Sequence, residues 1–311
     1  MVTRPPTLAA ARTRLAREIL KKVAGPDMDE VRDRIHRTPG PRLFPPGSPI
    51  RRVNADASMY IGGLRALLLQ SLHPMPMAAV VDHSGYRGDP WGRLARTAGF
   101  IASTTFGNED EAASAIARVR HVHEFVNGHT PDGVPYTATD PDLVRFIHIA
   151  GVDSFLTAYQ RYGAGRLTPA ECDTYVAQAA TVALRLGATR APMTVRELRA
   201  DIDEFRPALR ATPGAYSVMR FLLLSAPVPL LARPAYALLA AGAVDLLPPW
   251  ARRMYRIPEL PLAWPLSRPG ARVVTRVLRN VLAAEPVVNA DEEDLPGARP
   301  IPVSLPVHPP A

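Results

Sequence analysis

The sequence predicts an all-α fold, a compact bundle of about eight to ten helices. Three observations lead to this prediction. Apolar residues recur at intervals of three and four, no window shows a sustained alternation of period two, and residues typical of helix ends punctuate the chain at regular intervals. With 311 residues, of which 47% are hydrophobic, the chain is long enough to bury a sizeable core.

The helix boundaries are marked by capping residues. Each predicted start combines an Asp, Asn or Thr cap with a proline at the first helical position or an acidic residue three positions later. These starts lie at Asp89, Asn108, Asp140, Thr168 and Thr194. The predicted ends lie at Pro74, Gly107, Gly128, Gly163 and Gly187. The helix after Asn108 is expected to cover about residues 109–127.

The two ends of the chain differ in composition from its middle. Residues 1–52 are basic and rich in proline, with a helix near 8–23 followed by an extended loop. Residues 286–311 combine proline with acidic residues and are expected to form a loose tail. We therefore predict a basic N-terminal arm over 1–52, an all-α domain over 53–285 and a C-terminal tail.

Charge and cysteine content narrow the class of protein. The net charge is +8, but arginine accounts for most of the excess and no basic patch is interleaved with aromatic residues, so we expect no nucleic-acid partner. Cys172 is the one cysteine, which excludes an internal disulfide and fits a reducing compartment. The first residues contain no apolar stretch of signal-peptide length. We expect a cytoplasmic protein.

An apolar segment over 221–250 raises the question of membrane contact. Arg233 and several prolines interrupt it, which argues against a regular spanning helix. We interpret it as buried core or as an apolar lid. Peripheral membrane contact is the alternative interpretation, both for this segment and for the basic N-terminal helix.

The stretch RVRHVHEFVNG places two histidines on one predicted helix. His123 continues the series Ala112, Ile116 and Val119, whose spacing defines one inward face. His121 lies on the opposite face, where it is expected to be solvated. His123 is thus either a hydrogen-bonded core residue or a metal ligand, and His148 occupies a similar apolar face of the next helix.

The stretch GDPWGRLART places Arg93 and Thr97 four residues apart, on one face of a helix. Phe100 and Thr104 continue this face, which is too apolar for a fully solvated surface. A cation in such surroundings requires an anionic partner, which is either an acidic side chain of the protein or a bound ligand.

Several separate motifs, taken together, resemble one bacterial oxygenase family. They are LLLQSLHP, VDHSGYRGDPWGRLART, TFGNEDEA, RVRHVHEFVNG, PYTATDPDLVRFIHIAGVDSFLTAYQRYG and LTPAECDTY. The family includes the latex clearing proteins, which are rubber oxygenases, and the MpaB-type oxygenase of mycophenolic acid biosynthesis. The resemblance implies an all-α domain that holds haem b through one axial histidine and cleaves an unsaturated lipid or isoprenoid with dioxygen.

The resemblance also implies roles for particular residues. The family's axial histidine falls on His123, and its arginine and threonine beside the haem fall on Arg93 and Thr97, which we expect to contact a propionate or bound dioxygen. Arg96 stands where the rubber-cleaving members have a lysine able to cap the iron, and His148 is a further candidate beside the cofactor. Residues 70–88 offer only Asp82 as a carboxylate base.

The sequence therefore predicts a haem b-dependent oxygenase that acts on a hydrophobic small molecule and dioxygen. Two alternatives remain open at this point. One is a protein that binds haem or a hydrophobic ligand without turnover, in which His123 still binds the metal. The other is an all-α protein without a metal, in which His123 is a core residue.

Overall fold

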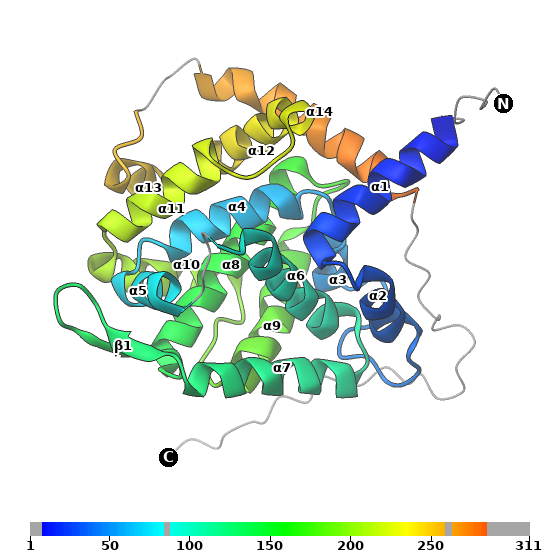
Figure 1. The fold of residues 1–311 in the computed structure, drawn as a ribbon. Coiled ribbons are helices and arrows are strands. Elements are labelled where there is room, and N and C mark those ends of the chain that lie inside the picture. The colour runs from blue at the N-terminus through cyan, green and yellow to red at the C-terminus, as the bar shows by residue number, and fades with distance from the viewer. Residues whose placement is uncertain (1–7, 84–87, 259–262, 285–311) are drawn as a thin grey trace.

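The computed structural model describes residues 8–83, 88–258 and 263–284, and these residues form an all-α bundle (Figure 1). The α-helices in the described residues are α1 (Leu8–Ala24), α2 (Met28–Arg37), α3 (Pro49–Asn54), α4 (Met59–Gln70), α5 (Pro74–His83), α6 (Pro90–Phe106), α7 (Glu109–Glu124), α8 (Pro141–Tyr162), α9 (Pro169–Leu186), α10 (Val195–Phe205), α11 (Pro213–Leu224), α12 (Arg233–Asp245), α13 (Pro249–Met254) and α14 (Ala263–Leu282). Two short 3₁₀ helices, η1 (Arg206–Ala208) and η2 (Leu230–Ala232), flank α11.

Helix α8 lies at the centre of the bundle and is buried along most of its length. Asp140 caps its start, where its carboxylate accepts a hydrogen bond from the amide of Asp142 over 2.8 Å, and Gly163 follows its end. The main core cluster joins α8 to α4, α9 and α10 through large apolar side chains such as Ile149 and Tyr175. Burying each such side chain contributes about 1.5–3 kcal/mol.

A buried arginine ties three helices to this centre. Arg65 on α4 donates to Asp153 and Ser154 on α8, both over 2.7 Å, and to the carbonyl of Leu246 after α12 over 2.8 Å. Its charge is therefore paired with that of Asp153, each of its three nitrogens donates a hydrogen bond, and the side chain fixes α4 against α8.

Helices α6 and α7 form a hairpin joined at Gly107 and Asn108. Figure 1 shows that they diverge from this corner, with α8 and α9 behind them. At the corner, Ser103 on α6 donates to the buried carboxylate of Glu111 on α7 over 2.8 Å. Helices α1 and α2 pack against α6 from the other side. The predicted boundary between 52 and 53 falls inside α3, and the predicted tail lies outside the described residues.

The structure corrects several expectations. Pro74 begins α5 instead of only ending the preceding helix, because a proline suits the first turn of a helix. The helix expected over 109–127 ends at Glu124, since the chain continues into the strand β1 (Asn127–His129), which pairs antiparallel with β2 (Pro135–Thr137). There are also more helices than expected in the described residues, because short helices such as α2, α3, α5 and α13 stand between the long ones.

The apolar segment 221–250 divides into parts with different environments. Its second half is core, as predicted, with Leu239, Ala243 and Val244 buried. The expectation of burial is wrong for the connection between α11 and α12, where Leu230 and Leu231 are exposed. No helix among the described residues is long and apolar enough to cross a membrane.

Candidate functional site

The ends of α5 and α7 meet at one corner of the bundle. The Nε2 atom of His83, the last residue of α5, lies 3.0 Å from the carbonyl oxygen of Asn127 in β1. Beside it, the hydroxyl of Tyr136 in β2 donates to the carboxylate of Asp82 over 2.7 Å. The start of α6 packs instead beside the end of α1, where the ammonium of Lys22 lies 5.9 Å from the centroid of the Trp91 ring.

His123 lies in the last turn of α7 and is half-buried. The series that precedes it on the same face has Ala112 and Ile116 buried and Val119 half-buried, as its spacing predicts. Desolvation lowers the pKa of His123, so its imidazole is neutral at pH 7. A neutral imidazole is the form that binds iron.

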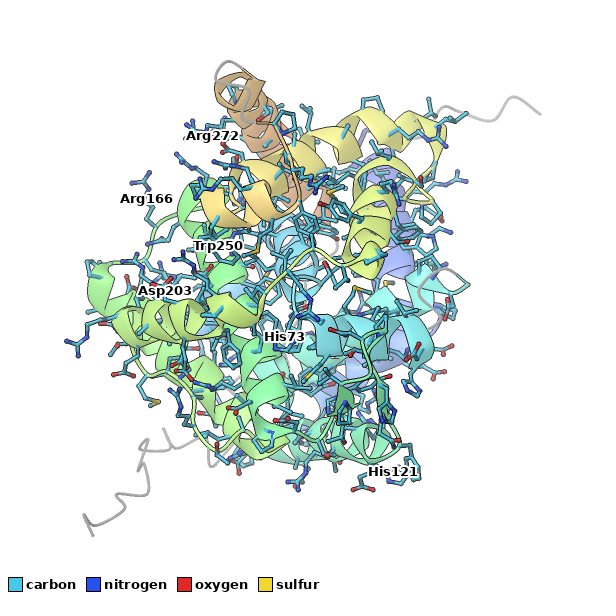
Figure 2. All side chains as sticks on the ribbon, turned by 90° about the vertical axis from the view of Figure 1, so that its left-hand side faces the viewer. His73, His121, Arg166, Asp203, Trp250 and Arg272 are labelled. Carbon is cyan, nitrogen blue, oxygen red and sulfur yellow. The ribbon has the colours of Figure 1, made fainter. Side chains whose placement is uncertain are left out.

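His121 lies on the opposite, solvated face, as predicted. Its side chain is 70% exposed, and its Nδ1 atom lies 3.3 Å from the carboxylate of Glu124. In Figure 2 His121 lies at the lower edge of the molecule. The two histidines of the motif therefore have different surroundings, and His121 is a natural control for any experiment on His123.

The pair Arg93 and Thr97 lies near the start of α6. Arg93 is half-buried and Thr97 is exposed, whereas Phe100 and Thr104 are more enclosed, so the face becomes more buried toward the C-terminal end of α6. The hydroxyl of Thr97 donates to the carbonyl of Arg93 over 3.1 Å. This hydroxyl must rotate away from the helix before it can donate to a ligand.

Arg96 points away from the bundle. Its guanidinium lies 3.3 Å from the carboxylate of Asp89, and both side chains are well exposed. Asp89 also caps α6, since it accepts a hydrogen bond from the amide of Gly92 over 2.8 Å. Arg96 would have to leave this surface ion pair to contact a cofactor, and its cofactor-binding role remains a prediction.

His148 lies on the row of α8 that contains Val144 and Val152, two buried residues. Val144 packs with Ala183 and Ala188 at the end of α9. The Nε2 atom of His148 is buried and has no hydrogen-bond partner, and desolvation lowers the pKa of the ring to about 4. An unpartnered buried nitrogen costs about 1–3 kcal/mol of stability, so it is a candidate for contact with a ligand.

Several of these residues have the chemistry that a haem would require of the protein. The porphyrin supplies four of the ligands of the iron, so the protein needs one neutral nitrogen, a cation for the propionates and apolar walls. His123 is such a nitrogen, Arg93 is a half-buried cation, and Phe100 packs against the main core. Among the residues that the structure describes, no group of three or more His, Cys, Asp or Glu side chains could hold a metal ion by itself.

Two features of this region escaped the sequence analysis. The first is the contact between Asp82 and Tyr136, which joins α5 to β2; burial and this carboxylate raise the pKa of Tyr136 to about 12. The second is the packing of His73, whose position at the end of an apolar helix is visible in the sequence: its ring is buried beside those of Phe146 and Phe205, and its Nδ1 atom has no hydrogen-bond partner. Figure 2 shows His73 in the interior of the molecule.

Comparison of the sequence with protein families identifies an oxygenase catalytic domain. A family model described as "ER-bound oxygenase mpaB/B'/Rubber oxygenase, catalytic domain" matches residues 50–284. The chain belongs to this family, as its motifs indicate. The family is metal- or haem-dependent in general and uses dioxygen and a small-molecule substrate. Comparison with curated proteins and with solved structures gives no match.

Proposed function

We propose that the protein is a haem b-dependent oxygenase that acts on a hydrophobic small molecule. The observation that carries this proposal is the position of His123 in a chain of this oxygenase family. The imidazole stands at the end of the inward face of α7, and desolvation keeps it neutral. Haem b, when bound, would supply the chemistry that activates dioxygen.

The protein contributes the ligand and its orientation. His123 would hold the cofactor by one ring nitrogen, and α7 would fix the direction of the ring because Ala112 and Ile116 anchor this face in the core. Arg93 on α6 would hold a haem propionate or donate a hydrogen bond to the substrate dioxygen through its guanidinium. His148 would contact the cofactor pocket with its unpartnered Nε2 atom.

Thr97 and Arg96 would differ in what they can reach. Rotation of the Thr97 hydroxyl away from the carbonyl of Arg93 costs one weak hydrogen bond, about 0.5–1.5 kcal/mol, so the group can donate to a bound ligand. Arg96 would act only if it exchanged its exposed contact with Asp89 for one with a propionate. Thr97 is therefore the stronger candidate for a catalytic role.

The hydrophobic substrate class is supported by the outer row of α4. Tyr60, Leu64 and Leu67 remain only partly buried although α4 packs on the central helix. A methyl group added at Gly63, on the same row, would meet no atom within 4 Å. Apolar side chains beside open space suit an apolar ligand, which would also exclude water from reactive oxygen species.

Dioxygen consumption by the haem-loaded protein tests the proposal. Unsaturated fatty acids and isoprenoid alcohols are the substrates to try, with isotopically labelled dioxygen and mass spectrometry of the products. We expect consumption that depends on the substrate, with label in the product. Haem and substrate binding without such consumption would favour a binding protein. Purified protein that takes up no haem would favour the metal-free alternative.

A further inference from the structure

The connection between α11 and α12 carries leucines that face solvent. Leu224 is 81% exposed, Leu230 is 72% exposed and Leu231 is 97% exposed. Pro227, Pro229 and Pro234 prevent a continuous helix here, so the chain turns outward through η2 instead of packing its leucines on the core. Clustered leucines this exposed indicate an apolar partner, because single exposed apolar residues are common but such clusters are not.

Helix α14 provides a second exposed surface, which is made of valine and arginine side chains. Ala271 and Thr275 are fully buried, whereas Val273 and Val277 on the other side are more than half exposed. Arg272 and Arg276 stand beside these valines and are also exposed. A helix that alternates valine and arginine along its outer face has the pattern of an element that lies on a membrane surface.

Helix α14 is held firmly in this orientation. The buried carboxylate of Asp245, at the end of α12, binds Arg268 of α14 over 2.9 and 3.0 Å. Asp56, before α4, binds Arg279 near the end of α14 over 2.8 and 3.0 Å. These two ion pairs fix the inner side of α14, so its outer face cannot turn inward.

Helix α1 extends the exposed surface. It packs against α14, and its Leu15, which is half-exposed, follows the exposed Arg12 and Arg14. Figure 1 shows α1, α12 and α14 together on the upper side of the molecule. We name the surface formed by these three helices and the connection from Leu224 to Ala232 the α1–α12–α14 face. The exposed apolar residues of these elements are Leu15, Leu224, Leu230, Leu231, Val273 and Val277.

The charge of this face identifies the kind of partner. The sequence has no acidic residue between Glu204 and Asp245, and α14 has none. Glu18 is the one acidic residue of α1, which has five basic ones. Exposed arginines on all three elements would repel the same face of a second copy, whereas they would attract the phosphates of anionic lipids.

We propose that the α1–α12–α14 face binds the surface of a bilayer that contains anionic lipids. Leu224, Leu230 and Leu231 insert at the level of the headgroups, and the arginines of α1 and α14 contact lipid phosphates. This inference does not depend on haem. It describes a peripheral contact made by one defined surface.

Co-sedimentation of the full chain with lipid vesicles tests this proposal. We expect binding to phosphatidylcholine vesicles that contain phosphatidylglycerol, weaker binding to pure phosphatidylcholine and a loss of binding as salt increases. The double substitution Leu230→Ser with Leu231→Ser should weaken binding by about tenfold or more. It should leave the folded state intact, as thermal melting can check, because both side chains are already in solvent.

The matched control is Val134→Ser with Leu184→Ser, which removes two exposed apolar side chains elsewhere. Helix α9, which carries Leu184, lies toward the side of α7, and Figure 2 shows Arg272 and His121 on opposite sides of the molecule. The control should bind vesicles as the wild type does. The proposal is overturned if the wild type does not bind anionic vesicles, or if the two double variants bind them equally. It is also overturned if the wild type forms a dimer whose amount rises with protein concentration and depends on Leu230 and Leu231.

Discussion

The protonation of buried histidines governs both stability and the candidate site. Desolvation lowers the pKa of His123, and it lowers the pKa of His73 and of His148 to about 4. A positive charge on Arg210 further depresses the pKa of His73. All three rings are therefore neutral at pH 7 in the folded protein, whereas an unfolded histidine takes up a proton near its ordinary pKa of about 6.5.

This difference predicts a loss of stability in mild acid. The stabilisation is complete above pH of about 6.5 and is lost as the pH falls toward 4, because the unfolded chain then binds protons that the folded chain does not. For His73 the loss should be on the order of 1–3 kcal/mol. Urea unfolding of the wild type and of His73→Leu between pH 7.5 and 5 measures it. Equal pH dependence in both proteins would contradict this role of His73.

A substitution at Thr97 can distinguish a role in haem binding from a role in catalytic turnover. The substitution Thr97→Val keeps the shape of the side chain and removes the hydroxyl. We expect the haem spectrum to be retained and kcat to fall roughly 10²-fold, the usual cost of losing one hydrogen-bond donor to developing charge.

The control for Thr97 is Thr174→Val on α9. The Thr174 hydroxyl is also exposed and also donates to the carbonyl four residues earlier, that of Ala170, over 3.0 Å. This variant should retain full activity. Unchanged kcat in both variants would show that the Thr97 hydroxyl only bonds its own helix.

Arg93 and Arg96 are three residues apart on α6 but differ in burial. If Arg93 holds a haem propionate, Arg93→Ala should lower haem retention, measured as haem per protein after gel filtration. If Arg93 instead donates a hydrogen bond to dioxygen, haem retention should be unchanged and turnover should fall. Arg96→Ala should lower haem retention less than Arg93→Ala does, because the guanidinium of Arg96 must first leave its exposed contact with Asp89. A larger effect of Arg96→Ala than of Arg93→Ala would reverse the two assignments.

At the scale of single helices, the capping residues predicted most starts and ends. Asn108 accepts from the amide of Glu111 over 2.9 Å, as the spacing indicated. Thr168 and Glu171 form a complete capping box at the start of α9, and Gly187 ends that helix with a left-handed φ of 115°. Such signals are local, so a sequence can show them without knowledge of the rest of the fold.

The hairpin after α7 was missed, although its turn has a recognisable signature. The residues Pro131, Asp132 and Gly133 form a turn sequence, and Gly133 takes a positive φ of 81°. The two strands are only three residues long, too short to show alternation. The contact of β2 with Asp82 joins residues 54 positions apart, which no local pattern could indicate.

Two adjacent glycines of α4 predict opposite changes in stability. A methyl group at Gly62 would lie 2.9 Å from the Cδ1 atom of Phe155 and 3.2 Å from its Cα atom, so Gly62→Ala should cost about 1–3 kcal/mol. Gly63→Ala meets open space and should stabilise α4 by about 0.5–1 kcal/mol. Denaturant unfolding measures both. Equal effects would mean that α4 does not pack on α8 as described.

At the scale of the whole molecule, the candidate site depends on contacts that join distant parts of the chain. The periodicity of α7 indicated which histidine turns inward, and the structure confirms that difference in burial. The periodicity could not indicate that α5 and the hairpin of β1 and β2 would meet beside the end of α7. It also could not show that Arg96 pairs with Asp89, because surface ion pairs depend on side-chain conformation rather than on spacing.

The central claim is that His123 is the protein ligand of haem iron. The most direct test is the absorption spectrum of protein produced with ample haem precursor, for the wild type, His123→Ala and His121→Ala. We expect a Soret band in the wild type and in His121→Ala, and its loss in His123→Ala with unchanged helical content by circular dichroism. A Soret band of equal intensity in both variants would remove His123 from this role.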